Sequence, residues 1–387
     1  MKPNFSSRLK NCNPSATLEI SEMASKLERK GKDVISLGVG EPDFDTPEPI
    51  KQCAIQALKD GFVHYTESQG IENLREKITQ KLKKQNGVDT NKKEIITTPG
   101  AKYALYLICQ GLIDEGEEAM LFDPAWVSYP EMIKLAGGKV KWCPTDENHS
   151  PEVERFKEII HEGTKLVILN SPCNPTGKVY SKETIEAITE ISREKDVFVI
   201  SDEVYEKIIY EKSHYSPRSD YENVITVNGF SKTYSMTGWR LGYLNANEEI
   251  VNNLTKIQQH SVSCPTSFVQ KGARCALTDE IDPYVDEMVN KFEKRRDLVM
   301  EKLNKIEQLS CNEPEGSFYA FPKVGVDSMK FSKKMLKKAN VAITPGKAFG
   351  RKGEGHFRMS FANSEERINE ALNRISVFLE EVLNSFS

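Results

Sequence analysis

The stretch Val197-Phe198-Val199-Ile200-Ser201-Asp202-Glu203-Val204-Tyr205 joins a continuous apolar run to a cluster of polar residues. An apolar run without alternation predicts a strand that is buried on both faces of a sheet. Four further strands are predicted at 94–98, 119–122, 166–169 and 224–227. Helical patterns lie between them, such as 181–195, where Ser181 and Thr184 are candidate N-cap residues. This alternation predicts an α/β fold, in which helices cover both faces of a mostly parallel central sheet.

Polar residues directly follow four of these five predicted strands. In an open α/β sheet, ligands bind beyond the carboxyl ends of the strands, where the loops of neighbouring strands meet. The sequence therefore predicts one site that is built from the segments at 98–102, 170–177, 201–205 and 229–232. The convergence of these four segments is stronger evidence for a binding site than any one of the motifs alone.

The length of 387 residues predicts two domains, because a single hydrophobic core rarely serves a chain of more than about 300 residues. After about residue 280 the pattern changes to long charged helices and short strands. We expect a large domain at 46–280. A smaller α+β domain is expected to combine 281–387 with the N-terminal segment 1–45, which contains a predicted helix at about 15–30.

Composition and charge exclude several classes of protein. The formal net charge of −4 provides no basic surface for nucleic acid. No apolar run approaches the roughly 20 residues needed to span a bilayer, and the N-terminal segment 1–6 lacks the apolar core of a signal peptide. We therefore expect a cytoplasmic protein that binds neither nucleic acid nor a membrane.

The cysteines and histidines show no metal-binding pattern. The eight cysteines contain no CxxC spacing, and the six histidines contain no HExxH pair. We expect no metal site, and we expect the cysteines to be free thiols in a reducing cytosol.

The segment Ser231-Lys232-Thr233-Tyr234-Ser235-Met236-Thr237-Gly238-Trp239-Arg240 places a lysine eight residues before an arginine in a Gly- and aromatic-rich context. It resembles the pyridoxal-phosphate segment of the aspartate aminotransferase superfamily, and the resemblance continues from about Pro14 to Ala362. The segments 14–17, 40–47 and 126–130 resemble most closely the prokaryotic-type aspartate aminotransferases of class I. The resemblance implies fold type I, a pyridoxal 5′-phosphate cofactor and a homodimer.

Lys232 would carry the cofactor as a Schiff base, which requires the neutral amine. An unperturbed lysine has a pKa of about 10.4 and is protonated at neutral pH. The site must therefore desolvate the amine or place cations near it. Arg240 is a candidate for such a cation, and its planar fork also suits a phosphate.

The resemblance also implies contacts with the cofactor ring. Asp202 would face the ring nitrogen, where a carboxylate keeps the pyridinium protonated and the ring able to accept electrons. Tyr205 and Asn174 would hydrogen-bond the phenolic oxygen of the ring. Trp126 would stack on the ring face.

The cofactor phosphate would lie at the start of a helix, where backbone amides and the helix dipole favour an anion. The implied phosphate contacts are Gly100, Ala101, Lys102, Ser231 and Arg240. Tyr65 resembles the tyrosine that family members donate to the phosphate across a dimer interface. Gly229 departs from the family, which often has a serine there, so that Ser231 or water would supply the missing contact.

For the substrate, Arg358 matches the arginine that grips the α-carboxylate, and Gly40 would allow close backbone approach beside it. Lys102, helped by Thr17, would bind the distal carboxylate of aspartate or glutamate. The substrate would also contact Trp126 and Asn174. Asn13 is not the basic residue associated with prephenate use, which disfavours prephenate as a substrate.

These roles imply an aminotransferase that moves an amino group between an L-amino acid, aspartate by preference, and a 2-oxo acid such as 2-oxoglutarate. Lys232 would also move the proton between substrate and cofactor, and the kinetics would be ping-pong. Two alternatives stay open. One is an aminotransferase for aromatic amino acids, alanine or kynurenine, and the other is a carbon–sulfur lyase that uses the same cofactor.

Overall fold

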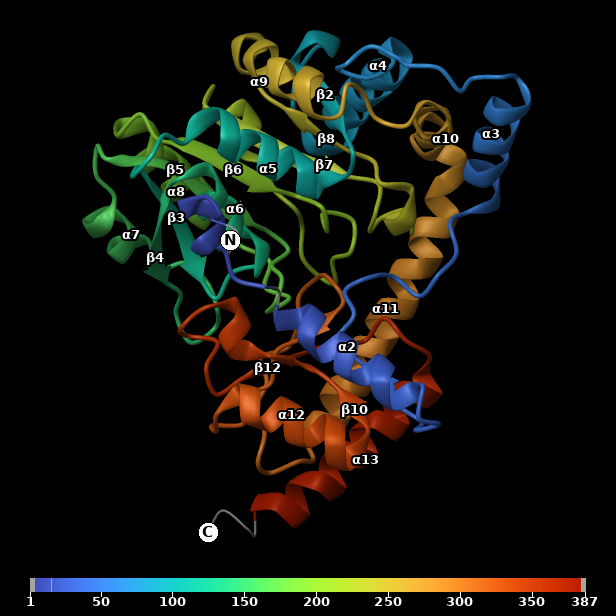
Figure 1. Cartoon of the computed structure of the whole chain (residues 1–387), viewed down its shortest axis with the longest axis vertical. Helices are drawn as coiled ribbons and strands as arrows, with labels where there is room; N and C mark the ends of the chain where they lie inside the picture. Colours follow the sequence, from blue (N-terminus) through green and yellow to red (C-terminus); the bar gives the residue numbers. More distant parts are fainter. Residues whose placement is uncertain (1–3, 15, 384–387) are drawn as a thin grey trace.

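The structure, a computed structural model, describes residues 4–14 and 16–383, and for residues 16–18, 382 and 383 it describes the backbone alone. A seven-stranded sheet with the order β2-β8-β7-β6-β5-β3-β4 forms the centre of the larger part of the molecule (Figure 1). Its strands are β2 (Ile95–Thr98), β3 (Glu118–Asp123), β4 (Lys139–Pro144), β5 (Thr164–Asn170), β6 (Phe198–Asp202), β7 (Val224–Gly229) and β8 (Gly242–Asn245). The five predicted strands are present, and the α/β fold class is confirmed.

Strand β8 is antiparallel to both of its neighbours, whereas the pairs from β7 to β4 are all parallel. The prediction missed β8, because four residues that include Gly242 and Asn245 form no apolar run. Strand β4 was also missed, because it lies at the edge of the sheet and alternates Lys139 and Lys141 with apolar residues. The polar ends of β5, β6 and β7 meet at one edge of the sheet, as parallel strands require.

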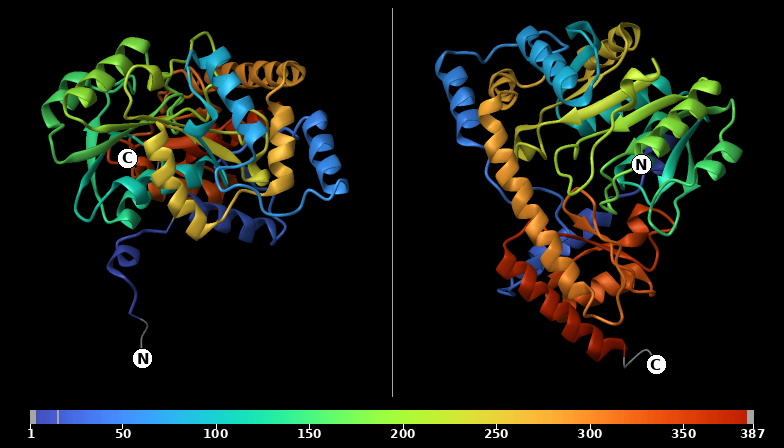
Figure 2. Two further views of the ribbon diagram at one scale, coloured as in Figure 1. Left: turned by 90° about the horizontal axis from the view of Figure 1, so that it is seen from above. Right: turned by 180° about the vertical axis from the view of Figure 1, so that it is seen from behind.

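Helices cover both faces of the sheet, as the two views of Figure 2 show. One face packs on α5 (Ala101–Leu112), α6 (Ser128–Ala136) and α9 (Glu248–Ser261), and the other on α7 (Val153–Ile159) and α8 (Lys182–Glu194). Ser181 is the N-cap of α8, and its Oγ accepts a hydrogen bond from the backbone N–H of Thr184 at 3.2 Å. Thr184 therefore lies inside the helix and is not a cap.

A third group of helices packs beside β2 and β8. It contains α3 (Glu48–Lys59), α4 (Glu72–Lys81) with its π-helical continuation η1 (Leu82–Asn86), and α10 (Ser267–Ala276). Short 3-10 helices occur as η2 (Lys92–Glu94), η3 (Pro217–Ser219), η4 (Thr237–Trp239), η5 (Asp279–Ile281) and η6 (Gly346–Phe349). None of the helices in the described part of the chain is both long and apolar enough to cross a membrane.

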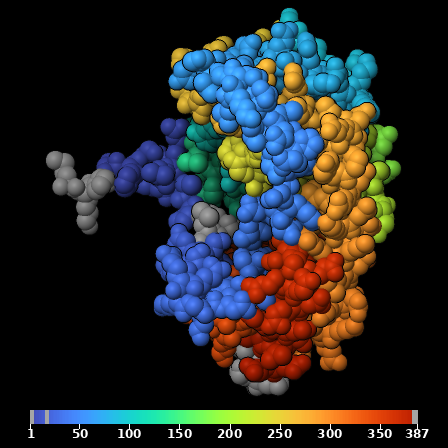
Figure 3. Space-filling model, turned by 90° about the vertical axis from the view of Figure 1, so that its right-hand side faces the viewer, coloured from blue at the N-terminus to red at the C-terminus, as the bar shows by residue number. Residues whose placement is uncertain are grey.

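The long helix α11 (Asp282–Leu303) leads from the larger part to the smaller part of the molecule (Figure 1). The smaller part contains α12 (Ser328–Ala339), α13 (Glu365–Leu383) and a three-stranded sheet of β11 (Thr344–Pro345), β12 (Phe357–Ser360) and β9 (Tyr319–Ala320). The N-terminal segment packs here, since β1 (Ile35–Ser36) pairs in parallel with β10 (Val341–Ala342) and α2 (Ala16–Glu28) lies against α12. The short helix α1 (Ser7–Lys10) stands out from the body (Figure 3).

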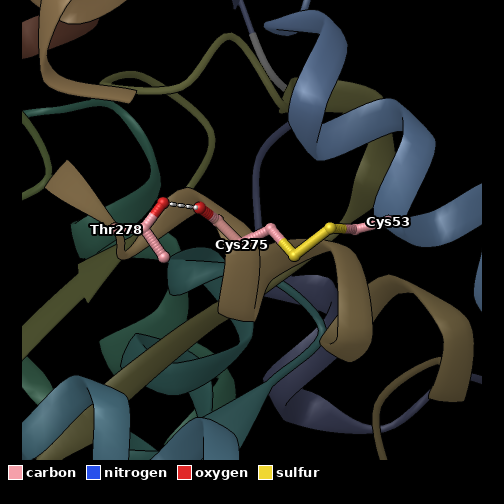
Figure 4. Close-up of a disulfide and its surroundings, with 3 residues drawn as sticks. All are labelled: Cys53, Cys275 and Thr278. Carbon is pink, nitrogen blue, oxygen red and sulfur yellow. Dashed lines mark hydrogen bonds between the residues drawn. A yellow bond between two sulfur atoms is a disulfide. The ribbon is translucent and has the colours of Figure 1, made fainter. Parts of the chain in front are cut away.

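The prediction that all cysteines are free thiols was wrong. Cys53 of α3 and Cys275 of α10 form a disulfide (Figure 4), whereas the other six cysteines are free. The two helices pack closely because Gly272 of α10 has no side chain, and a Cβ there would lie 3.2 Å from that of Ala54. The bonded cysteines are separated by 222 residues, so that no local spacing reveals the pair.

Candidate active site

A cavity of about 480 Å³ lies at the carboxyl ends of β5, β6 and β7 and reaches the smaller part of the molecule. Most of the predicted site residues line it, namely Gly40, Ala101, Lys102, Trp126, Asn174, Asp202, Tyr205, Ser231, Lys232, Arg240 and Arg358. Gly100 lies against the guanidinium of Arg240. Tyr319 also lines the cavity and was not predicted.

Lys232 lies in the loop between β7 and β8, and its Nζ donates a hydrogen bond of 2.5 Å to the backbone carbonyl of Gly40. Burial lowers the pKa of the Lys232 amine to about 8, and the positive charges of Arg358, Arg240 and Lys102 act in the same direction. A larger fraction of the amine is therefore neutral near pH 7 than for an ordinary lysine. Desolvation and nearby cations were the two causes that the sequence led us to expect.

Asp202 ends β6 with its side chain buried. Burial raises the pKa of this carboxyl to about 6, although hydrogen bonds from Tyr129 and the backbone of Val204 oppose the rise. The bond from Tyr129 Oη to Asp202 Oδ2 is 2.6 Å long, and both groups are buried. Asp202 is therefore a carboxylate above about pH 6, held in the low-dielectric interior beside the cavity.

Arg358 of β12 is buried, and its guanidinium faces the cavity. Nη1 donates to Oδ1 of Asn174 and Nη2 to the backbone carbonyl of Gly38, both at 2.8 Å. Nε has no hydrogen-bond partner, and no carboxylate among the described residues pairs with this arginine. A buried cation without an anionic partner is a favourable place for the carboxylate of a ligand.

Tyr319 of β9 explains why a glycine stands at position 40. A Cβ on Gly40 would lie 2.6 Å from the Tyr319 hydroxyl, which is closer than atoms approach in proteins. That hydroxyl also lies 2.9 Å from the hydroxyl of Tyr205, and the Tyr319 ring packs 4.3 Å from the guanidinium of Arg358. Tyr319 thereby links Gly40, Tyr205 and Arg358, three residues that the sequence analysis had assigned to the site separately.

The start of α5 forms one wall of the cavity. Gly100 has a φ of 85°, which favours glycine, and a Cβ there would lie 2.5 Å from Nη2 of Arg240. The backbone amides at the beginning of α5 and the guanidinium of Arg240 are thus close together. Amides at a helix N-terminus and a planar cation are the groups that bind phosphate.

Lys102, in the first turn of α5, places its Nζ 4.9 Å from the ring centre of Trp126. Burial lowers the pKa of this amine, and the charge of Arg240 lowers it further. Lys102 and Arg240 also line a second cavity of about 690 Å³, which continues outward past Tyr103, Tyr106 and Trp142. Lys102 therefore stands between the inner cavity and this outer one.

Two predicted residues are not placed at this cavity. The Tyr65 side chain is 89% exposed and lies beside a different surface hollow, next to Phe62 and Thr66. The side chain of Thr17 lies outside the part of the chain that the structure describes. Tyr129 and Tyr319 were missed by the sequence analysis, although Tyr129 lies in the quoted segment 126–130.

The comparisons with known proteins agree on one family. The family model for aminotransferase class I and II matches residues 32–375. A probable aspartate aminotransferase of Methanocaldococcus jannaschii is 45% identical, over 97% of this chain and 100% of that protein. An aromatic-amino-acid aminotransferase of Thermococcus litoralis is 40% identical, over 97% of this chain and 98% of that protein. Among solved structures, the aspartate aminotransferase of Thermus thermophilus with maleate is similar to this chain with a TM-score of 0.93 and 37% sequence identity. The similarity covers 97% of this chain and 99% of that chain.

Proposed function

Because the chain belongs to the class I and class II aminotransferase family, we propose that it transfers the amino group of aspartate to 2-oxoglutarate with pyridoxal 5′-phosphate as cofactor. The observation that carries this proposal is the inner cavity. Its lining combines an amine of lowered pKa at Lys232, a buried carboxylate at Asp202 and a buried guanidinium at Arg358 that pairs with no carboxylate among the described residues.

The residues present fit the cofactor. Asp202 offers a carboxylate that stays ionised above about pH 6 and suits a protonated ring nitrogen. Gly100, Ala101, Ser231 and Arg240 offer amides, a hydroxyl and a cation for the phosphate, and Trp126 offers a ring face. Tyr205 lines the same cavity and can donate its hydroxyl to the phenolic oxygen. When bound, the cofactor supplies an aldehyde carbon for the amino group and a ring that accepts electrons from the substrate's Cα.

The protein side of the mechanism follows from these positions. Arg358 would bind the substrate's α-carboxylate, since its guanidinium pairs with no carboxylate in the part of the chain that the structure describes. Lys232, whose pKa is lowered to about 8, would act as the general base near neutral pH. It would take the proton from the substrate's Cα and hold it within the cavity. The 2-oxo acid product leaves before the second substrate binds, so the kinetics are ping-pong.

Lys102 is the residue that favours a dicarboxylate substrate. Its amine is partly desolvated against Trp126, and among the described residues it has no ion-pair partner. A carboxylate that entered the cavity beyond the α-carboxylate site would meet this cation. The relatives named as aspartate aminotransferases support the same substrate.

A second substrate class is favoured by the outer cavity. Tyr103, Tyr106 and Trp142 line it with aromatic rings, and one relative at 40% identity is named an aromatic-amino-acid aminotransferase. An aromatic side chain directed past Lys102 would contact these rings. The aromatic substrate is therefore the alternative that the experiment below has to separate from aspartate.

The homodimer is part of the proposal, and exposed apolar residues support it. Ile55, Leu58, Val63 and Tyr65 are all exposed on α3 and the loop after it. Exposed large apolar side chains that gather on one face are typical of an interface with another chain. We propose that Tyr65 of one subunit reaches the active site of the other.

The experiment is a visible-absorbance titration of the purified holoenzyme with aspartate, alanine, tyrosine and cystathionine in turn. Aspartate should bleach the yellow colour at the lowest concentration, and Lys102→Met should raise the required aspartate concentration by a larger factor than that for alanine. Bleaching by tyrosine at lower concentration would favour the aromatic alternative. Release of pyruvate or 2-oxobutyrate from cystathionine would indicate a lyase. A protein that takes up no pyridoxal 5′-phosphate would overturn the proposal.

A further inference from the structure

The turn that follows β6 presents different residues to its two sides. Asp202 and Tyr205 line the inner cavity, whereas Glu203 and Glu206 are buried behind it. The backbone joins the two sides, since Glu206 N–H donates to the carbonyl of Glu203 and Glu203 N–H donates to the carbonyl of Val227 in β7. A shift in the position of Glu203 or Glu206 would therefore also shift Asp202 and Tyr205, which face the proposed cofactor.

The carboxylate of Glu203 is fully buried and is bound at both oxygens. Oε1 accepts hydrogen bonds from Ser201 at 2.8 Å and from Ser216 at 2.7 Å. Oε2 lies 3.1 Å from Nε2 of His214, which is carried by the loop before η3. Oε2 also accepts a hydrogen bond from Nδ2 of Asn86 at 3.4 Å, and neither ring nitrogen of His214 has a hydrogen-bond partner in the described part of the chain. The contact between Glu203 and His214 is an ion pair when His214 is protonated.

Glu206 is held by residues from α4 and η1. Lys81 donates a hydrogen bond to Oε1 of Glu206, and Asn86 donates to Oε2 at 2.7 Å. Lys81 also donates to Asn86 at 2.8 Å. Burial alone would raise the pKa of Glu206, but Lys81, His214 and Asn86 together lower it to about 2. Glu206 is therefore a carboxylate at all working pH values.

With both glutamates ionised, a protonated histidine balances the charges of this cluster. Glu203 and Glu206 contribute two negative charges and Lys81 one positive charge, which leaves one buried negative charge when His214 is neutral. An uncompensated buried charge is strongly unfavourable. Burial by itself lowers the pKa of His214, but the charge of Glu203 reverses this effect and the net shift is upward. Tyr234 and Tyr243 also face the cluster, and burial raises the pKa of both hydroxyls, so they stay neutral.

We propose that His214 is a positioning residue for the cofactor site, because its imidazolium neutralises Glu203 and thereby holds the turn that presents Asp202 and Tyr205. This inference rests on the proposed function. A group whose pKa is higher in the folded protein stabilises it fully at low pH, and the contribution disappears as the pH rises through that pKa. The holoenzyme should therefore retain its cofactor less well at high pH.

The cluster of Glu203, Glu206 and His214 also has the composition of a metal site, since one ligand atom from each lies within 4.8 Å of the others. The ammonium of Lys81 already occupies one oxygen of Glu206. A divalent cation would add its charge to that of Lys81 and exceed the charge of two carboxylates. We therefore favour the protonated histidine, and the experiment includes the metal as an outcome.

The experiment measures the cofactor that the holoenzyme retains after dialysis between pH 6 and pH 9. Wild type should lose affinity for pyridoxal 5′-phosphate by roughly tenfold as His214 deprotonates. His214→Gln should be weak at all pH values, and His214→Lys should bind tightly throughout because its charge does not titrate in this range. His161→Gln is the matched control, because it removes a surface contact of 2.9 Å with Glu118 far from the turn.

Each outcome decides the inference. Equal pH profiles for wild type and His214→Gln would overturn it, and so would a His214→Lys variant that is folded and behaves like His214→Gln. A rise in the melting temperature of wild type, but not of His214→Gln, on addition of Zn²⁺ would also overturn it in favour of a metal site. Failure of wild type to bind pyridoxal 5′-phosphate at any pH would reject the proposed function itself.

Discussion

Tyr129 donates a 2.6 Å hydrogen bond to Asp202, and both side chains are buried at the back of the inner cavity. Burial raises the pKa of Asp202 to about 6, and the hydrogen bond from Tyr129 opposes this rise because it stabilises the carboxylate. A bond to a buried charged group contributes more than one between neutral groups. Tyr129 is thus the group that does most to lower the pKa of Asp202, ahead of the backbone N–H of Val204.

We predict that Tyr129→Phe moves the acid limb of kcat/KM upward by about one pH unit or more, because the hydrogen bond to a charged group is lost. The measurement is the pH profile of kcat/KM for aspartate. Tyr215→Phe is the control, since Tyr215 donates to Asp220 at the surface. An unchanged acid limb in Tyr129→Phe would show that Asp202 does not govern it.

Gly40 makes a second prediction possible, because a Cβ there would lie 2.6 Å from the hydroxyl of Tyr319. We expect Gly40→Ala to lower kcat/KM by roughly tenfold to a hundredfold, since it displaces Tyr319 and the carbonyl that accepts from Lys232. Steady-state kinetics of the purified variant measure this effect.

The control for that variant is Gly238→Ala, because a Cβ at Gly238 would have no neighbour within 4 Å. Adding Tyr319→Phe to Gly40→Ala removes the atom that clashes and should restore part of the lost activity. A double variant no better than Gly40→Ala would mean that the clash with the hydroxyl is not the cause.

The buried pair of Lys81 and Glu206 leads to a prediction about stability. Its side chains are each 6% exposed, and breaking such a pair by removing one charge costs about 3–5 kcal/mol. We expect Glu206→Gln to lower the free energy of unfolding by this amount at pH 7. Urea denaturation of wild type and variant measures it.

The pH dependence of this effect has a definite sign. The pKa of Glu206 is lowered from 4.5 to about 2 in the folded protein, so its stabilisation is complete above about pH 4.5 and disappears as the pH falls through 2. The difference between wild type and Glu206→Gln should therefore shrink in acid. Glu301→Gln, which breaks an exposed pair with Lys305, should have no measurable effect. A pH-independent difference would contradict the charge-based explanation.

The strands of the sheet were predictable because a strand buried on both faces carries a continuous apolar run, as Leu166-Val167-Ile168-Leu169 does within β5. Strand β8 was not, because its pairing with two antiparallel neighbours decides its structure and its four residues carry no pattern. Among the residues that line the cavity, Asp202 and Asn174 lie in segments that the sequence analysis placed after predicted strands, whereas their roles were implied by the family resemblance. Tyr319 was missed because it reaches the cavity from β9 in the other part of the molecule.

The buried cluster behind the turn was missed for the same physical reason. Lys81 and Glu206 are 125 residues apart, and a lysine in a charged helix reads as a surface residue unless its partner is known. His214 lies in a loop whose sequence shows no periodicity. The tertiary packing of α4 against the turn creates these contacts, and a local pattern contains no information about it.

The disulfide between Cys53 and Cys275 is the feature in which the structure departs most from the sequence-based expectation. It links α3 to α10, two helices that the fold already packs together. Alkylation of the unfolded protein without a reductant should therefore label six cysteines, and all eight after reduction. Labelling of all eight without reduction would restore the expectation of free thiols.

We also expect the double variant Cys53→Ser and Cys275→Ser to fold and to be less stable than oxidised wild type by about 2–4 kcal/mol, because the bond restricts the unfolded chain. Urea denaturation without reductant measures the difference, and it should vanish when wild type is reduced. Cys12→Ser is the control, since Cys12 is a free thiol. Apolar contacts already hold α3 against α10. We therefore expect the double variant to have the same cofactor content and the same kcat as wild type.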